Sequence, residues 1–141
     1  MPVNRPKHLM IIGGGVFQVP VIKTAKSMGL KVVVTDYNPE SEGMLLADFP
    51  IEVSTRNINL TVNTAKQFHI ACPLDGVMTV GTDASQTVAA VADALNLPGI
   101  PFEVAERATD KIKMRQILEE KGVPVPQFRS VWTLDEGREA L

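Results

Sequence analysis

The stretch at residues 8–18 constrains the fold more than any other part of the chain. It reads HLMIIGGGVFQ, an apolar run at 9–12 followed by Gly13, Gly14 and Gly15 and then by a helical pattern. An uninterrupted apolar run suits a strand that is buried on both faces. Glycines remove the Cβ atoms that would block a left-handed turn or a close ligand. The stretch therefore predicts a strand, a tight turn and a helix whose first N–H groups can hold an anion.

The glycine spacing only partly matches the G-x-G-x-x-G fingerprint of dinucleotide-binding folds. With Gly13 and Gly15 as the first two glycines, Gln18 stands where the third should be. This departure weakens an NAD or FAD interpretation and supplies an amide that can hydrogen-bond a ligand. The alternative is that the glycines only make a short turn and that Gln18 is a solvated residue of the first helical turn.

An acidic residue ends the second apolar run. Residues 31–36, KVVVTD, predict another buried strand, and Asp36 lies 23 positions after Gly13. In a Rossmann unit an acid at this place accepts the ribose hydroxyls, which favours a dinucleotide or adenosine ligand. The alternative is that Asp36 caps the turn at 37–39, which contains Asn38.

Alternating strand and helix patterns continue through the chain and predict the α/β class. Short strands are expected at 51–54 and 74–80. Helices are expected at 16–28, 59–68, 86–95, 103–108 and 111–121, with one helical turn at 44–48. We expect a Rossmann-like open parallel sheet of order 3-2-1-4 with flanking helices, in a domain covering residues 1–102.

Ligands of open parallel sheets bind at the carboxyl ends of the strands, where the winding changes direction. In the order 3-2-1-4 this point lies between the first and fourth strands. The loop after the fourth strand contains Gly81, Thr82, Asp83 and Ser85. We expect it to face the glycine turn across one crevice. The alternative is that Asp83 or Ser85 is only the N-cap of the next helix.

Composition excludes several classes of function. The chain has 14 basic and 16 acidic residues and a net charge of −2, which gives no electrostatic footprint for nucleic acid. The single Cys72 and the isolated His8 and His69 have no metal-ligand spacing, so no metal site is expected. The sequence has no apolar run near 20 residues and no signal peptide, so a cytoplasmic protein without membrane contact is expected. The oligomeric state, including a homodimer, is left open.

Residues 103–141 read as linker helices followed by the start of a second domain. Lys111 and Arg115 share a helical face with Glu119, and physical reasoning alone favours a solvated stripe with one ion pair. A strand is expected at 128–132 and a capped helix from residue 133. The chain ends about two turns into that helix, so we expect it to be part of a longer protein.

Seven motifs in one order resemble the N-terminal region of ATP-grasp carboxylate–amine ligases, and the resemblance covers nearly the whole chain. Large-chain-like carbamoyl-phosphate synthases look closest, with biotin carboxylase and the purine-pathway ligases as cousins. The motifs are Gly13-Gly14-Gly15, Asp36-Tyr-Asn38-Pro39, Ala47-Asp48, Asp75 to Asp83, Leu97-Pro-Gly99, Thr109-Asp110-Lys111 and Lys121-Gly122-Val-Pro-Val-Pro126.

The resemblance implies an enzyme in which a pre-ATP-grasp domain precedes two lobes that hold ATP and Mg²⁺. Such enzymes phosphorylate a carboxylate or bicarbonate, and an amine then attacks the acyl phosphate. By position, the glycine turn with Gln18 and the loop at 81–85 would face the acceptor substrate, and Lys111 would contact the nucleotide. The magnesium-binding acids lie outside these residues, so the 141 residues alone are expected to be inactive and to hold no cofactor tightly.

Two other hypotheses remain at this point. One is an NAD-binding Rossmann domain of an oxidoreductase, which Asp36 favours and Gln18 opposes. The other is a separate small-ligand binding module that catalyses nothing.

Overall fold

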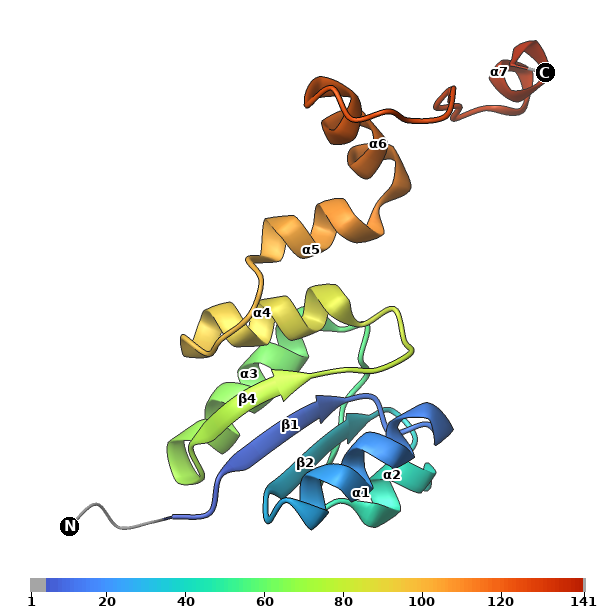
Figure 1. The fold of residues 1–141 in the computed structure, drawn as a ribbon. Coiled ribbons are helices and arrows are strands. Elements are labelled where there is room, and N and C mark those ends of the chain that lie inside the picture. The colour runs from blue at the N-terminus through green and yellow to red at the C-terminus, as the bar shows by residue number, and fades with distance from the viewer. Residues whose placement is uncertain (1–4, 141) are drawn as a thin grey trace. The chain divides into compact units, whose positions relative to one another are not determined.

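The computed structural model describes residues 5–140 and divides into two compact units, Met1–Glu106 and Arg107–Leu141. We call them the N-terminal and the C-terminal unit and describe each by itself. The N-terminal unit is built on four parallel strands in the order β3-β2-β1-β4, as predicted (Figure 1). The strands are β1 (His8–Ile12), β2 (Lys31–Asp36), β3 (Phe49–Glu52) and β4 (Leu74–Met78).

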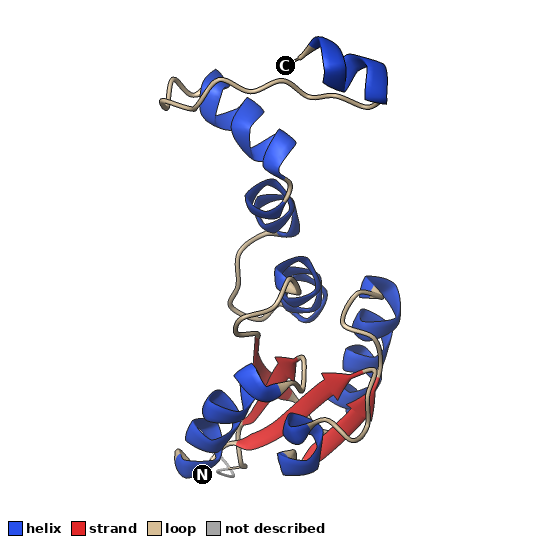
Figure 2. Cartoon of the chain, turned by 90° about the vertical axis from the view of Figure 1, so that its right-hand side faces the viewer, coloured by secondary structure: helices blue, strands red, loops and turns tan. Residues whose placement is uncertain are grey.

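Helices cover both faces of this sheet (Figures 1 and 2). The helical elements are the 3₁₀ turn η1 (Val16–Gln18), α1 (Val19–Ser27), α2 (Glu42–Leu46), α3 (Ile58–Ala71) and α4 (Ser85–Leu95). The α1 and α2 helices pack on one face, and α3 and α4 pack on the other. The α5 helix (Phe102–Thr109) begins in the N-terminal unit and ends in the C-terminal one.

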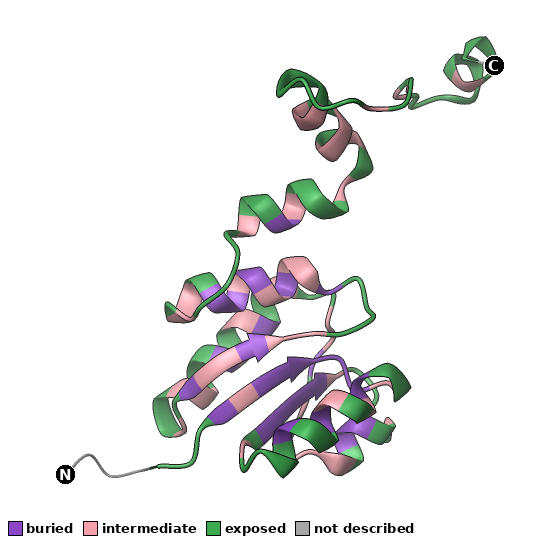
Figure 3. Cartoon of the chain, in the orientation of Figure 1, coloured by how far each residue is buried: buried purple, intermediate pink, exposed green. Residues whose placement is uncertain are grey.

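The apolar run of β1 is buried on both faces because side chains of a strand alternate between them. Ile11 packs toward α1 and α2, whereas Met10 and Ile12 pack toward α3 and α4. All three side chains are fully buried, and Figure 3 shows β1 and β2 as the most buried part of the unit. Because the four strands are parallel, their carboxyl ends lie at one edge of the sheet.

The start of β1 is fixed by a carboxylate of β4. The ladder between β1 and β4 is irregular between His8 and Leu9, and Asp75 lies in this irregular part. Its carboxylate accepts hydrogen bonds from the His8 N–H and from both terminal nitrogens of Arg5, each at 2.8 Å. The Arg5 guanidinium therefore holds the pKa of Asp75 below its ordinary value.

A second carboxylate, that of Asp48, joins the start of β2 to the segment before β3 through a hydrogen bond. Its Oδ2 accepts the Val32 N–H at 2.9 Å, and its Oδ1 lies 3.4 Å from Lys31 Nζ and 3.5 Å from Lys26 Nζ. Burial opposes ionisation of Asp48, but the Val32 hydrogen bond and the two lysines outweigh it and lower the pKa.

Replacing Asp48 by asparagine is expected to destabilise the N-terminal unit by about 1 kcal/mol at pH 7. The folded-state pKa of Asp48 is below the unfolded value of about 3.9. As the pH falls toward 3, the unfolded chain therefore binds more protons at this residue than the folded chain does. The stabilisation that the ionised Asp48 gives to the folded state is then lost. Urea unfolding at pH 7 and pH 3, followed by the β1 and β2 amide signals, should show a mutational effect that shrinks at pH 3. The control is Glu52→Gln, at an exposed carboxylate of β3. An equal loss at both pH values would contradict the assignment.

The C-terminal unit contains α6 (Lys111–Glu120) and α7 (Leu134–Glu139). The expected caps are confirmed, since Asp110 accepts the Ile112 and Lys113 N–H groups and Thr133 forms a capping box with Glu136. The strand expected at 128–132 is wrong: this segment is irregular. A strand needs a hydrogen-bonded neighbour, and residues 107–140 contain no other extended segment that pairs with it. Residues 5–140 contain no helix long and apolar enough to cross a membrane.

Candidate functional site

The glycine turn joins β1 to η1 through a backbone that only glycine adopts easily. Gly13 has φ +102°, and its N–H donates to the Thr35 carbonyl at 2.8 Å, which extends the ladder beyond β1. Gly14 is enclosed, because a Cβ there would lie 2.6 Å from Ser41 Oγ and 3.2 Å from the Asp36 Cβ. The turn is thus held against the end of β2 on one side and α2 on the other.

Gln18 is buried and connects the two predicted ligand loops. Its side chain is 4% exposed, and its Nε2 donates to the carbonyl of Val80, just before Gly81. The interpretation of Gln18 as a solvated residue is therefore wrong. The structure gives its amide a bridging role that holds the glycine turn beside the loop after β4.

Asp36 binds backbone groups with both carboxylate oxygens. Oδ2 accepts the Gly14 N–H at 2.7 Å, and Oδ1 accepts the Asn38 N–H at 2.9 Å. The expectation that Asp36 caps the turn after β2 is confirmed by the second bond. The first bond ties the glycine turn to β2, so Asp36 shapes the site as well as lining it.

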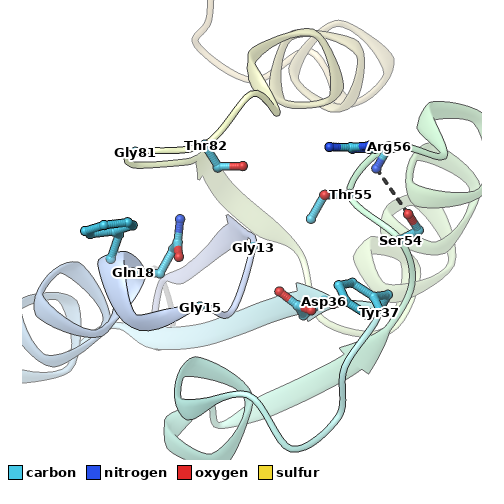
Figure 4. A pocket seen from close by; sticks show the side chains of 11 residues that line it. Gly13, Gly15, Gln18, Asp36, Tyr37, Ser54, Thr55, Arg56, Gly81 and Thr82 are labelled. Atoms are coloured by element: carbon cyan, nitrogen blue, oxygen red, sulfur yellow. Dashed lines mark hydrogen bonds between the residues drawn. The ribbon is translucent and has the colours of Figure 1, made fainter.

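A cleft of about 560 Å³ opens at the carboxyl ends of the strands (Figure 4). Its lining comes from the glycine turn and from the segments after β2, β3 and β4. The lining residues are Gly13, Gly15, Phe17, Gln18, Asp36, Tyr37, Ser54, Thr55, Arg56, Gly81 and Thr82. Six of the predicted site residues are thus brought together: Gly13, Gly15, Gln18, Asp36, Gly81 and Thr82.

Four other predicted residues of this unit lie outside the lining of the cleft. Gly14 is packed beneath it, and the Asn38 side chain accepts the Glu40 N–H at 3.0 Å within its own turn. Asp83 and Ser85 lie further along the loop that leads to α4. Their alternative role as helix caps is wrong, since the N-cap residue is Ala84 and no side chain caps the helix.

The loop at 54–56 is the part of the cleft that sequence reasoning missed. It follows β3, whose carboxyl end lies at the same edge of the sheet as those of β1, β2 and β4. The parallel topology was the available signal, because every carboxyl end of a parallel sheet contributes to this edge. Phe17 and Tyr37 were also missed, and both rings are exposed, 70% and 73%.

The cleft has the chemistry of a binding site. Its lining contains neither histidine nor cysteine, and the oxygens of its only carboxylate already accept backbone N–H groups. What it offers a ligand is hydroxyl groups, backbone groups, two aromatic rings and one guanidinium. This set suits recognition of a small polar molecule with an apolar part.

Lys111 belongs to the C-terminal unit and lines a separate cleft of about 320 Å³ there. Arg115 and Arg129 line it too, and the Arg115 guanidinium lies 5.6 Å from the centre of the Phe128 ring. Within the described part of this unit, no ion pair joins Glu119 to Lys111 or Arg115, so that expected pair is wrong. Three cationic side chains around one cleft suit a polyanion such as a nucleotide phosphate chain.

Comparison with known proteins identifies the family of the chain. Residues 22–99 match the ATP-grasp N-terminal domain, which is more than half of the chain. The chain is 31% identical over 84 residues to the uncharacterized protein y4rH of Sinorhizobium fredii, covering 60% of this chain and 18% of that protein. It is 25% identical over 144 residues to the multifunctional protein pyr-3 of Neurospora crassa, covering 94% of this chain and 8% of that protein.

Two solved structures extend the match to the fold. The L-amino acid ligase of Bacillus licheniformis superposes with a TM-score of 0.75 at 29% identity, over 94% of this chain and 34% of that one. The phosphoribosylglycinamide synthetase of Anaerococcus prevotii gives a TM-score of 0.75 at 27% identity, over 96% of this chain and 34% of that one. The chain therefore spans about a third of these two ligases and less than a fifth of the curated relatives. By its match over residues 22–99, the chain belongs to the ATP-grasp N-terminal domain family.

Proposed function

We propose that this chain is the acceptor-binding domain of an ATP-dependent carboxylate–amine ligase. The observation that carries the proposal is the open cleft at the carboxyl ends of the strands, in a chain of the ATP-grasp N-terminal domain family. Family membership favours this function over the NAD-binding alternative. The involvement of both Asp36 oxygens with backbone groups supports the same choice.

In the proposed reaction, an oxygen of the carboxylate or bicarbonate attacks the γ-phosphorus of ATP, and ADP leaves. The amine nitrogen then attacks the acyl carbon, phosphate leaves with the carboxylate oxygen, and the nitrogen loses a proton. The N-terminal unit would hold and orient the acceptor, which lowers the entropic part of the barrier. By the order of its motifs, which resembles that of large-chain-like carbamoyl-phosphate synthases, the enzyme would be similar to those synthases.

The C-terminal unit fits an anionic nucleotide but not a metal ion. Phosphate oxygens would be held by Lys111, Arg115 and Arg129. We propose that residues 103–141, which include this unit, are linker helices and the start of the ATP-grasp domain. Residues 5–140 hold no cluster of three or more His, Cys, Asp or Glu side chains that suits a metal ion. No step of the proposal is therefore assigned to Mg²⁺ within this chain.

The proposal is tested by measuring ADP release from ATP with pools of carboxylates and amines. We expect turnover by the natural protein that carries this sequence and none by residues 1–141 alone. Lys111→Gln in the natural protein should lower kcat/KM by about 100-fold, because a cation that faces the phosphates stabilises charge in the transition state.

The matched control is Lys121→Gln, which removes the same charge from the end of α6, outside the cleft that Lys111 lines. It should leave turnover unchanged. Equal effects of the two substitutions, or turnover by the 141 residues at the rate of the natural protein, would contradict the proposal.

A further inference from the structure

Arg56 is the cation of the N-terminal cleft. Among the lining residues it is the only one with a positive charge, and Asp36 is the only one with a negative charge. The Asp36 oxygens accept the N–H groups of Gly14 and Asn38, at 2.7 and 2.9 Å. The Arg56 guanidinium is exposed and makes no hydrogen bond or ion pair with any residue in the described range 5–140. Its donors are therefore available to a ligand.

The backbone of the loop that carries Arg56 is held by hydrogen bonds from two helices. Two buried threonines of different helices donate to this loop: Thr61 Oγ1 to the Ser54 carbonyl at 3.2 Å, and Thr87 Oγ1 to the Thr55 carbonyl at 2.6 Å. The Arg56 N–H also donates to Ser54 Oγ at 3.4 Å. The dashed line in Figure 4 marks this hydrogen bond. A loop that is already ordered loses less entropy on binding, so a contact made from it contributes more to affinity.

The aromatic rings give the cleft an apolar part. Phe17 on η1 and Tyr37 after β2 both line it, yet about 70% of each ring is exposed. In Figure 4, Tyr37 lies beside Asp36, on the side of the cleft from which the loop of Arg56 comes. A ligand that covers these rings removes apolar surface from water, which favours binding.

We propose that Arg56 binds the anionic head group of the substrate, whose apolar body lies against Phe17 and Tyr37. The guanidinium presents paired N–H donors that match two oxygens of a carboxylate or a phosphoryl group. The Ser54 and Thr55 hydroxyls lie next to it and can bind a further oxygen. Arg56 then selects small anions with an apolar side group. That this ligand is the acceptor rests on the function proposed above, whereas the selectivity itself is measured by binding alone.

The test uses the ¹⁵N-labelled chain and three probes: 3-phenylpropionate, phenyl phosphate and the neutral 3-phenylpropionamide. Binding is followed by the amide signals of Gly13, Gly15 and Gly81 and by the Arg56 Nε–H signal. We expect at least one anion to bind about tenfold or more tightly than the amide, the size expected for a hydrogen bond to a charged group. The stronger of the two anions identifies the head group as a carboxylate or a phosphoryl group.

Arg56→Gln should abolish this preference for the anion, and Arg56→Lys should retain only part of it, because a lysine cannot donate two parallel hydrogen bonds. Since the exposed Arg56 guanidinium makes no hydrogen bond or ion pair within residues 5–140, the fold should survive, and unchanged signals of β1 and β2 would verify it. The control is Lys23→Gln, which removes the same charge from the exposed face of α1, outside the cleft.

Three results would overturn the proposal: equal affinity for anions and amide in the wild-type chain, a preference that survives in Arg56→Gln, or no binding of any probe at the cleft. The proposed ligase function fails on a different measurement, the Lys111-dependent release of ADP. Failure of one is therefore distinguishable from failure of the other.

Discussion

Replacing Gly43 by alanine is expected to lower the free energy of unfolding of the N-terminal unit by about 3 kcal/mol, a large cost for one methyl group. A Cβ at residue 43 would lie 2.7 Å from the Gly14 carbonyl oxygen and 2.8 Å from the Gly14 Cα. These are backbone atoms, which cannot rotate away as a side chain could. The Gly43 N–H also donates to the Gly14 carbonyl at 2.7 Å, so relief of the clash would break this bond.

Hydrogen exchange of the Ile11 and Val33 amides reports the opening of this unit directly, without interference from the C-terminal unit. The matched control is Gly29→Ala, at a glycine with φ +79° and no atom within 4 Å of its Cβ. Its cost comes from the left-handed backbone alone, about 1 kcal/mol. If Gly43→Ala costs no more than Gly29→Ala, the contact between α2 and the glycine turn is not tight.

The second large effect is expected for Gln18→Glu, at about 2–4 kcal/mol at pH 8. The carboxylate cannot donate to the Val80 carbonyl as the Gln18 amide does, and it would be buried opposite another oxygen. Burial raises the folded-state pKa of the new carboxyl above its unfolded value of about 4.3. Between these two pKa values the folded chain binds more protons than the unfolded chain, so the stability of the variant falls as the pH rises through that interval.

Gln18→Met separates the charge from the loss of the hydrogen bond. It keeps the length of the side chain and removes the donor, so its cost should be smaller and the same at pH 5 and pH 8. Urea unfolding of both variants at the two pH values, followed by the β1 amide signals, measures the difference. A Gln18→Glu effect that does not change with pH would show that the new carboxyl is not buried.

The sheet was predictable because its strands have unambiguous patterns. The apolar runs at 9–12 and 32–34 are too short for helices, lie between turn signals and are buried on both faces, as parallel strands require. Half of the site followed from the same logic, since glycines and polar residues after parallel strands gather at one edge. Gly13, Gln18, Asp36 and Gly81 are examples.

The remaining features depend on contacts between residues far apart in sequence. Nothing local to Gly43 shows that Gly14 lies against it, and nothing local to Gln18 shows that Val80 is its partner. Arg56 lies in a short polar loop without a motif, and its place in the cleft depends on the position of β3 in the sheet. The strand predicted at 128–132 was wrong for the opposite reason. The local pattern of this segment suits a strand, but a strand also needs a hydrogen-bonded neighbour.

Transfer of ¹⁸O tests the central claim, that this domain serves a ligase that activates a carboxylate, most directly. The carboxylate that supports ADP release is labelled with ¹⁸O, and the released phosphate is analysed by mass spectrometry. An acyl phosphate intermediate predicts one ¹⁸O atom in the phosphate for each turnover, together with a new C–N bond. Release of phosphate that contains no oxygen from the carboxylate would contradict the account.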